Sequence, residues 1–475
     1  MKAATYTGIW WLPGSAPEEG LHGTLVFDPE TKPDLSVFGH LIEDGELGKS
    51  AIGIILGLSD DGKRITLLDN LFVGQKMHMP GLGQTRFHPR YILIGRHFSQ
   101  GEDAAFSGMY VTFDHLNAWS RLSGLRMQFE ALTGKAPHKI SAIYETPDSP
   151  PYKLLDMRLE FVTSLQQRLN IITQVELKPV VWIKLTWSQS KQIKELIKTI
   201  HHLRTFLAFG VGRPVHISEI SMIPSDKVTS NFEKWSDVDV LYASGGPHNE
   251  QQSLEREEML FHLETLGEGV GEILSHWFEK QAVLGPVYDL YFSSLYQTDL
   301  HLENQLLNYM QALETYNRRT FPNNTYLSKS AFRIFLKSLR AYIDKDHADI
   351  PPDVRGIFKN SFAFLNEFTQ RTRLAETVEC LGPSAHTLIV DIKEFVDIAV
   401  ATRNYLTHYS DQKHRVTGLR RLYILVQQLR FVLELCLLRQ LGLSAAKIAA
   451  VVDANQHYDE TKRMIQQAEP NEQVW

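Results

Sequence analysis

The sequence predicts an α+β multidomain protein, in which a mainly β, sandwich-like N-terminal region is followed by an all-α helical bundle. Its 475 residues are too many for one ordinary hydrophobic core, so two or three domains are expected. Up to about residue 245 the apolar runs are short, rich in β-branched residues and separated by turn residues. Beyond that point, apolar residues recur at helical spacing over long runs.

The first predicted domain, residues 1–145, is expected to consist of β-strands. Its clearest hairpin joins residues 52–58 to residues 64–68, because Asp61-Gly62 supplies the positive φ angles that a tight turn needs. Three further strands are predicted at residues 23–27, 91–95 and 108–113.

A second β-rich region, residues 146–245, is predicted to contain one amphipathic helix. The expected elements are strands at 158–161, 171–177 and 180–187, a helix at 191–209 that stops at Gly210, and strands at 217–222 and 238–242. Residues 246–254 are the predicted linker, because Gly246-Pro247 interrupts both helix and strand.

Residues 255–475 are predicted to form the helical domain. The expected helices are at residues 254–281, 287–295, 301–318, 328–344, 352–371, 384–408, 417–441 and 444–469. A series of this kind packs as a bundle.

Composition excludes several classes of protein. A net charge of −6 argues against a protein that coats nucleic acid, so any RNA contact must use a local patch. Only two cysteines are present, which excludes a disulfide framework and fits a reducing cytoplasm. We expect no metal, no cofactor and no membrane contact, because neither a metal-ligand cluster nor an export or transmembrane signal is evident.

The most informative residues are Arg403, Asn404 and His408. Arginine is permanently charged and its planar fork matches phosphate oxygens, whereas histidine both accepts and donates a proton near neutral pH. On a helix, Asn404 and His408 lie four residues apart and share a face, with Arg403 to one side. The three side chains therefore suit chemistry on a phosphodiester.

Basic residues follow this motif and are candidates for binding RNA. They lie in a turn-like segment and at the start of the next predicted helix: Lys413, Arg415, Arg420 and Arg421. Because few acidic residues accompany them, local positive charge is expected on an otherwise acidic protein.

The Arg-Asn-x-x-x-His element between two helices resembles the active motif of the HEPN superfamily (higher eukaryotes and prokaryotes nucleotide-binding domain). The order of a β-rich half and a HEPN-like bundle is similar to that of ApeA-type anti-phage proteins. Further similar stretches are residues 8–13, residues 95–98, Trp119 and residues 277–291.

The resemblance implies a metal-independent endoribonuclease that acts in anti-phage defence by abortive infection. It implies attack of an RNA 2′-hydroxyl on the adjacent phosphorus, with RNA, tRNA included, as the substrate. Arg403 would stabilise charge on the phosphorus oxygens, and Asn404 would orient His408 or bind phosphate. A homodimer formed through the HEPN-like domain would supply an acid and a base, and the β-rich half would respond to a phage-derived trigger.

Three alternatives remain at this point. Arg256 and His262 repeat the arginine–histidine pattern, but acidic neighbours favour a solvated helix face there. The bundle could bind RNA or a nucleotide without cutting it. The whole chain could also be a sensor scaffold with a ligand-binding β region.

Overall fold

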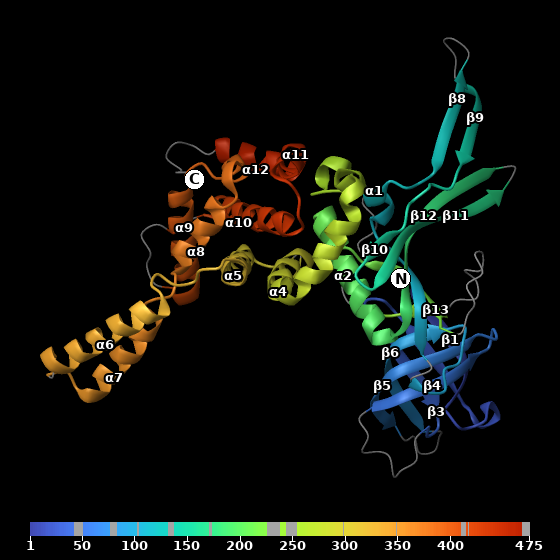
Figure 1. Ribbon diagram of the computed structural model, residues 1–475. Helices are drawn as coiled ribbons and strands as arrows, with labels where there is room; N and C mark the ends of the chain where they lie inside the picture. Colours follow the sequence, from blue (N-terminus) through green and yellow to red (C-terminus); the bar gives the residue numbers. More distant parts are fainter. Residues whose placement is uncertain are drawn as a thin grey trace. The chain divides into compact units, whose positions relative to one another are not determined.

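The computed structural model describes residues 1–467, apart from 42–50, 77–82, 102–103, 132–136, 171–172, 226–237, 244–253, 298, 348, 410–414 and 417. The chain divides into two compact units, Met1–Ser275 and His276–Trp475 (Figure 1). Of the predicted linker at 246–254, only Leu254 is among the described residues. Across the described part of the chain, no helix is long and apolar enough to cross a membrane.

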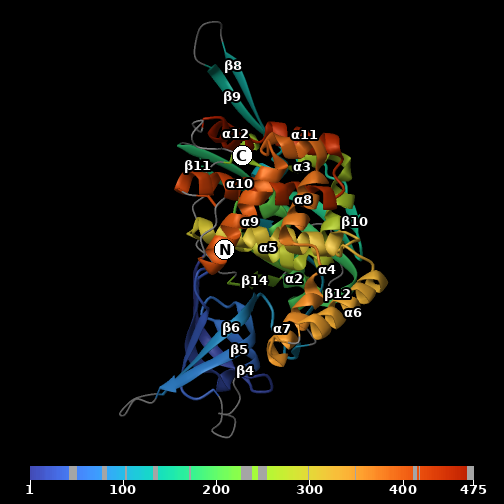
Figure 2. The ribbon, with the colours of Figure 1, turned by 90° about the vertical axis from the view of Figure 1, so that its left-hand side faces the viewer.

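Six strands of the first unit close into a β-barrel (Figure 2). Their order is β3-β2-β1-β4-β5-β6, and the barrel closes because β6 pairs with both β3 and β5. The strands are β1 (Ala4–Trp11), β2 (Leu21–Phe27), β3 (Asp34–Phe38), β4 (Ala51–Ser59), β5 (Arg64–Lys76) and β6 (Gln84–Ile94). Closure of the sheet takes the place of the sandwich-like layers that we expected here.

Strict alternation of side chains fills the barrel. In β2, Gly23, Leu25 and Phe27 are buried and the residues between them are not. The indole of Trp10 is fully buried in the same core. It fits because β4 carries Gly57 beside it, where a Cβ would overlap the indole ring. The predicted hairpin around Asp61-Gly62 is confirmed as β4 and β5.

The sheet continues beyond the barrel, in the order β6-β14-β13-β7-β12-β11-β10. Strands from before and after residue 145 therefore share one sheet. The additional strands are β7 (Ala105–Phe113), β10 (Tyr152–Leu154), β11 (Met157–Asn170), β12 (Gln174–Gln192), β13 (Ile217–Pro224) and β14 (Val238–Leu241). A separate hairpin pairs β8 (Leu125–Ala131) with β9 (Pro137–Tyr144).

Two predictions for this unit need correction. The strand pair expected at 171–177 and 180–187 is one strand, β12, because Pro179 pairs with Leu165 of β11 at a point where β12 has no pairing with β7 on its other side. The predicted helix is α2 (Ile193–Val211), which ends past Gly210. Its C-cap is Gly212, whose φ of 74° suits glycine. Short helical segments complete the unit: η1 (Pro17–Glu19), α1 (Leu116–Ser120), η5 (Arg256–Glu258), α3 (Leu263–Leu266) and η6 (Gly267–Gly269).

The second unit is helical, and helix α4 enters it from the first. Its helices are α4 (Val270–Tyr296), α5 (Leu302–Thr320), α6 (Lys329–Asp346), α7 (Pro352–Ser361), α8 (Gln370–Glu379), α9 (Ile392–His408), α10 (Leu419–Gln440), α11 (Ala445–Ala454) and α12 (Gln456–Gln466). Short 3-10 turns are η7 (Phe362–Phe364) and η8 (Gly382–Thr387).

Helix α10 forms the centre of the bundle. It packs against α5, α11 and α12, while α8 packs against α5 and α9. Its buried residues include Leu429, Val432 and Leu433, which are fully enclosed. The prediction of a mainly β first half and a helical second half is confirmed.

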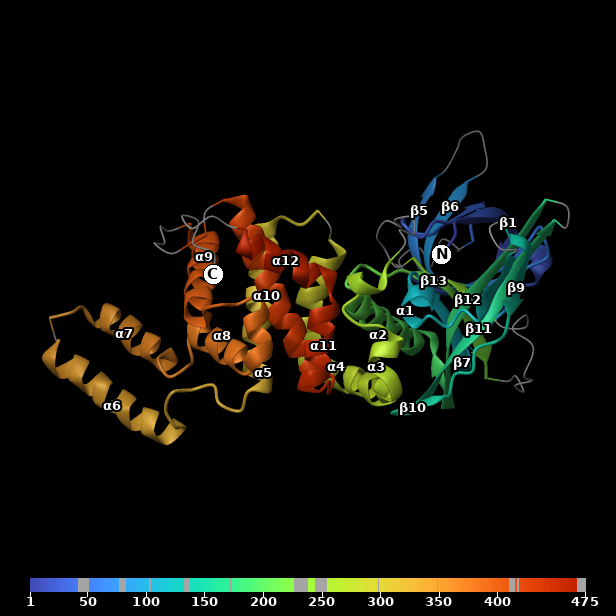
Figure 3. The ribbon, with the colours of Figure 1, turned by 90° about the horizontal axis from the view of Figure 1, so that it is seen from above.

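Several helix boundaries differ from the predictions. The helices expected at 254–281 and 287–295 join as α4, which runs through Pro286. The run at 384–408 starts as helix only at Ile392, and the run at 444–469 is divided at Asn455 into α11 and α12. Helices α6 and α7 form a hairpin that projects from α8 and α9 (Figure 3).

Candidate active site

Helix α9 delivers the predicted motif at its C-terminal end. The helix starts at Asp391, whose carboxylate accepts a hydrogen bond from the backbone N–H of Glu394 at 2.9 Å. Its middle is anchored in the bundle by Phe395, Ile398 and Ala399, all buried. From residue 403 onward the side chains are half-buried or exposed, so the motif emerges at the surface.

The three motif residues occupy the last two turns of α9. Arg403 and Asn404 are half-buried, and Nη1 of Arg403 donates to Oδ1 of Asn404 at 3.2 Å. His408 is exposed in the final turn. Around the helix axis, His408 lies about 40° from Asn404 but about 140° from Arg403. One copy of α9 therefore does not present Arg403 and His408 on a single face.

The helix ends abruptly after His408. Tyr409 adopts a left-handed conformation with φ of 51°, and its N–H donates to the carbonyl of Tyr405 at 2.6 Å. This conformation costs a residue other than glycine roughly 1–2 kcal/mol. The side chain of Tyr409 is 77% exposed and its ring meets that of Tyr405 edge-on. A large aromatic surface therefore stands beside His408 in the sequence and in space.

The chain returns to α9 before α10 begins. The N–H of Val416 donates to Oγ1 of Thr402, which is buried, at 3.0 Å. The guanidinium of Arg415 lies 3.9 Å from the centre of the Tyr405 ring, within cation–π range. Of the predicted RNA-binding residues, Arg415 is thus brought to the motif helix.

The other predicted RNA-binding residues lie in the first turn of α10 or outside the described residues. Arg420 is exposed and Arg421 is half-buried, both in the first turn of α10. That turn has no acidic residue, and its N-cap, Gly418, provides no side-chain cap. Two cations at the positive end of a helix dipole oppose helix stability but favour binding of an anion. Lys413 lies outside the described residues.

Sequence reasoning missed Thr402, Tyr405 and Tyr409. Tyr405 and Tyr409 alternate with basic residues, and that interleaving of aromatic and basic side chains is a known signal of nucleic-acid contact. Thr402 gave no signal, because its role is to accept a hydrogen bond from the backbone N–H of Val416, 14 positions further along the chain.

The buried Glu434 of α10 forms an ion pair, and two tyrosine hydroxyls connect it to α4 and α12. Nε of Arg430 donates to Oε1 of Glu434 at 2.7 Å, and the hydroxyls of Tyr291 and Tyr458 each donate to the same carboxylate at 2.6 Å. Burial alone would raise the pKa of Glu434. The Arg430 guanidinium and the two hydroxyls outweigh burial and hold that pKa below its usual range.

The second arginine–histidine pair is structural. Arg256 forms an ion pair with Glu264, and its Nε also donates to Nε2 of His262 at 3.0 Å. His262 caps α3 by accepting from the N–H of Thr265. Burial, followed by the charge of Arg256, lowers the pKa of His262. The predicted solvated helix face is instead a capping arrangement, and its cation is already neutralised.

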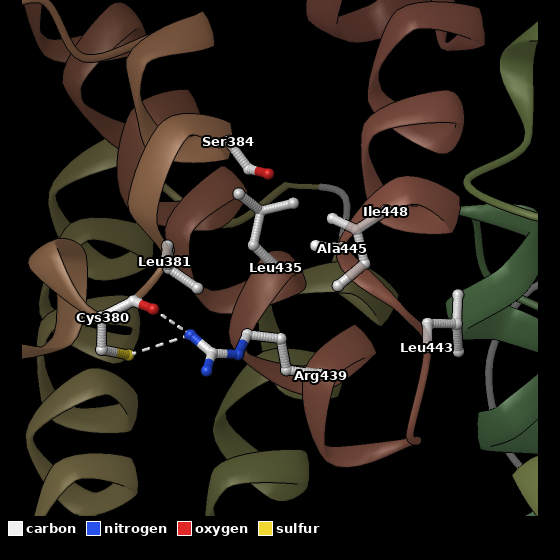
Figure 4. Close-up of a pocket in the computed structure, with 8 residues that line it drawn as sticks. All are labelled: Cys380, Leu381, Ser384, Leu435, Arg439, Leu443, Ala445 and Ile448. Atoms are coloured by element: carbon white, nitrogen blue, oxygen red, sulfur yellow. Dashed lines mark hydrogen bonds between the residues drawn. The ribbon is translucent and has the colours of Figure 1, made fainter.

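A cavity of about 330 Å³ in the second unit lies away from the motif (Figure 4). Leu381, Leu435 and Ile448 line it, and Arg439 donates from the rim to the carbonyl oxygen of Cys380. Helix α10 begins at Leu419, shortly after Val416 bonds to Thr402 of α9. Arg439 lies 20 positions further along α10, which is about 30 Å along the helix axis. Within the part of the chain that is described, no group of three or more histidine, cysteine or acidic side chains could hold a metal ion.

Comparison with known proteins identifies both halves of the chain. Residues 5–277 match the family model for ApeA N-terminal domain 1, and residues 307–447 match the model for the Apea-like HEPN domain. No curated protein and no solved structure matches the chain. The second match contains Arg403, Asn404 and His408. Because the first alone covers more than half of the sequence, the chain belongs to the ApeA family, with an N-terminal ApeA domain followed by an Apea-like HEPN domain.

Proposed function

We propose that this protein is a metal-independent RNA endonuclease that acts in anti-phage defence through abortive infection in the cytoplasm. The observation that carries the proposal is the set of Arg403, Asn404 and His408 at the surface end of α9, inside the region that matches the Apea-like HEPN domain. A cation, an amide and a titratable imidazole are the groups that a metal-free phosphodiester reaction requires.

The proposed reaction uses the 2′-hydroxyl of RNA as the nucleophile. A base removes the 2′-hydroxyl proton while the oxygen bonds to the adjacent phosphorus, and an acid protonates the departing 5′-oxygen. The products are a 2′,3′-cyclic phosphate and a free 5′-hydroxyl. Arg403 stabilises the charge that develops on the phosphorus oxygens, and Asn404 holds Arg403 in place through its carbonyl oxygen.

Two copies of the motif supply the acid and the base in this mechanism. His408 and Arg403 point about 140° apart around one helix, so one copy leaves part of the phosphate uncontacted. A two-fold homodimer through the HEPN-like domain brings a second pair of these side chains to the same phosphate. Each protomer then contributes one His408 to an in-line displacement.

RNA is held beside the motif by basic and aromatic groups. Arg415, stacked on Tyr405, and Arg420, exposed in the first turn of α10, supply positive charge. Lys413 and Arg421 complete the proposed RNA-binding set. Tyr409, 77% exposed, offers a flat surface for stacking a base next to the scissile phosphate. Transfer RNA is a candidate substrate because its loops expose unstacked bases.

The β-rich unit is proposed to sense infection and to restrain the nuclease. An unrestrained cytoplasmic ribonuclease harms its own cell, so activity must depend on a trigger, which we propose to be derived from phage.

The proposal is tested by incubating the full-length protein with total RNA and with purified tRNA in a chelator. We expect cleavage with cyclic phosphate ends, and cleavage slower by at least about 100-fold with Arg403→Ala or His408→Ala protein. A requirement for a divalent metal, or products with 3′-hydroxyl ends, would exclude the mechanism. Binding of RNA without cleavage, even with an extract of phage-infected cells added, would favour the alternative of a non-catalytic RNA-binding module or sensor scaffold.

A further inference from the structure

The hairpin of α6 and α7, residues 329–361, is a defined insertion in the bundle, which we call the arm. Its two ends are tied together where it leaves the bundle. Thr325 and Glu367 form an antiparallel bridge. The side chain of Asn366 accepts from the N–H of Leu327 at 2.7 Å and donates to the Leu327 carbonyl at 2.9 Å. The arm therefore has a fixed base.

Polar groups hold the two helices of the arm together. Asp344 on α6 forms ion pairs with Arg355 and Lys359 of α7. Arg340 adds a hydrogen bond to the carbonyl of Lys359 at 3.0 Å. In an ordinary helical hairpin the apolar stripes face each other. Here these three polar contacts form part of that contact.

Large apolar side chains of the arm are exposed to solvent. On α6, Ile334 is 68% exposed and Phe335 and Tyr342 are 50% and 54% exposed. On α7, Ile357 and Phe358 are 63% and 44% exposed. Ile334 and Phe335 are adjacent, Tyr342 follows them by eight and seven positions, and Ile357 and Phe358 are adjacent. At about 100° per residue, each set therefore lies within roughly 100° on one flank of its helix. A monomeric protein rarely leaves such stripes uncovered.

The exposed area matches what a stable dimer needs. Of the 23 exposed large apolar side chains among the described residues, five lie on the arm, and four more lie beside its base at Tyr326, Leu327, Phe364 and Leu365. A half-exposed large apolar side chain leaves roughly 100 Å² in water, so the five on the arm expose roughly 500 Å², and the arm together with its base exposes roughly 900 Å². Each partner in a standard protein interface contributes about 800 Å².

The two ends of the arm also differ in charge. Its base carries Lys329, Arg333 and Lys337, and the tip carries three acidic residues against one lysine: Asp346, Asp349, Asp353 and Lys345. Within the described structure, none of the three basic residues at the base and none of the three acids has an ion-pair partner. An acidic tip disfavours an anionic lipid surface or a nucleic acid as the occupant, whereas it complements the base of a second arm.

We propose that the arm is a dimerisation element that packs antiparallel against the arm of a second copy of this chain. This pairing covers the apolar stripes and sets the acidic tip of each arm against the basic base of the other. It is isologous, as a two-fold dimer requires. The inference deepens the homodimer of the proposed function by naming the surface that forms it.

The base of the arm is connected to the motif helix. Arg371, in the first turn of α8, forms an ion pair with Asp397 on α9. Asp397 precedes His408 by 11 positions, which places it on the same face of α9 and about 16 Å along the axis. An ion pair therefore links the base of the arm to the face of α9 that carries Asn404 and His408.

The apolar contact is tested by light scattering of the full-length protein at about 10 μM. We expect wild-type protein at twice the chain mass of 54.3 kDa and Ile334→Glu/Ile357→Glu protein at the mass of one chain. Val175→Glu in β12 is the matched control, because Val175 is 63% exposed, as is Ile357. Far-ultraviolet circular dichroism verifies that the double variant keeps its helices. A monomeric wild type, or a double variant that remains dimeric, overturns the proposal.

Charge reversal tests the antiparallel pairing. One variant reverses the base (Lys329→Glu, Arg333→Glu, Lys337→Glu) and another reverses the tip (Asp346→Lys, Asp349→Lys, Asp353→Lys). Each variant alone then sets like charges against like charges and is expected to be monomeric. A mixture of the two restores opposite charges at both ends and is expected to form heterodimers. Failure of the mixture to associate overturns the proposal, as does full association of each variant alone.

These experiments distinguish failure of the arm proposal from failure of the proposed nuclease function. RNA cleavage by a wild-type monomer removes both the arm contact and the two-copy mechanism, but leaves the nuclease activity standing. An arm-dependent dimer that never cleaves RNA supports the arm and removes the nuclease. Lys462→Glu/Arg463→Glu protein, altered at exposed positions of α12, is the control for the charge changes.

Discussion

At the end of α9, the His408 side chain is exposed and makes no hydrogen bond within the described structure. Its removal therefore leaves the fold intact while it removes a proton donor and acceptor. We expect His408→Ala to lower the rate of RNA cleavage by roughly 10²- to 10⁴-fold, the typical contribution of general acid–base catalysis. Initial rates on a defined RNA at saturating protein measure this loss.

Thr407→Ala is the matched control, because Thr407 is exposed in the same turn and its hydroxyl donates to the backbone carbonyl of Arg403. It should cleave at close to the wild-type rate. Equal rates for His408→Ala and wild type would remove His408 from the reaction.

A second prediction at this scale concerns the contribution of Glu434 to the free energy of unfolding. Glu434→Gln leaves the half-buried Arg430 without a counter-charge, which costs at most about 3–5 kcal/mol. The folded pKa of Glu434 lies below the ordinary value of 4.5, so its stabilisation is complete above that pH and is lost as the pH falls through the folded pKa. Urea unfolding at pH 7 and pH 3 should show a difference between the two proteins that shrinks in acid.

The exposed Glu460 of α12 provides a control for that measurement. Glu460→Gln should change the free energy of unfolding by less than about 0.5 kcal/mol at either pH. A constant difference between wild type and Glu434→Gln from pH 7 to pH 3 would show that the carboxylate charge is not what stabilises α10.

Single residues also show how far the sequence predicted the candidate site. Arg403, Asn404 and His408 were predicted on one helix because the apolar period before them is unbroken, and α9 carries all three. The contact between Arg415 and Tyr405 was not predictable, because it depends on how the loop folds back. The same holds for Tyr409, whose positive φ is imposed by the end of the helix.

At the scale of elements, β4 offers a direct test of barrel packing. A methyl group at Gly57 would overlap the buried indole of Trp10, whereas one at Gly53 on the same strand would meet no atom within 4 Å. Gly57→Ala should destabilise the protein by about 1–3 kcal/mol through overpacking. Gly53→Ala should be neutral or slightly stabilising. Thermal unfolding of the two variants compares them, and equal midpoints would contradict this account of the core.

Two elements that were predicted as separate pieces, β12 and α4, each contain a proline near the predicted break. Pro179 and Pro286 are strong breakers in isolation, but each lies where its missing N–H is tolerated. Pro179 occupies a stretch of β12 that pairs on one side only. Pro286 is flanked in α4 by Leu284 and Val287, both fully buried, so packing maintains the helix across it. Burial is not visible in the local sequence, which is why these boundaries were missed.

Closure of the barrel could likewise not be predicted from the local sequence pattern. The alternating pattern predicts strands and their exposed faces, but a sandwich and a barrel share that pattern. The decision rests on β6, which pairs with β5 along its length and with β3 over Gln84–Phe87. Contacts between strands distant in sequence determine this choice.

For the whole molecule, we predict protection of bacteria that depends on the α9 motif. Cells that express the full-length chain should resist a phage that supplies the trigger, and His408→Ala cells should not. The reason is that the proposed function requires cleavage, not only binding, of RNA for protection. Plaque counts measure protection, and immunoblotting verifies equal amounts of the two proteins. Equal protection by both would favour a defence mechanism without cleavage.

Strand β6 belongs to both the barrel and the extended sheet, and this affects how the first unit unfolds. Residues Ile92–Ile94 pair with β14 of the extended sheet, while Gln84–Phe87 pair with β3 of the barrel. Neither part can open without releasing a strand of the other. Amide protons along β6 should therefore exchange with solvent more slowly than those of the other strands, and the barrel and sheet should melt in one cooperative transition. Tight binding of a molecule to either part would raise that transition for both.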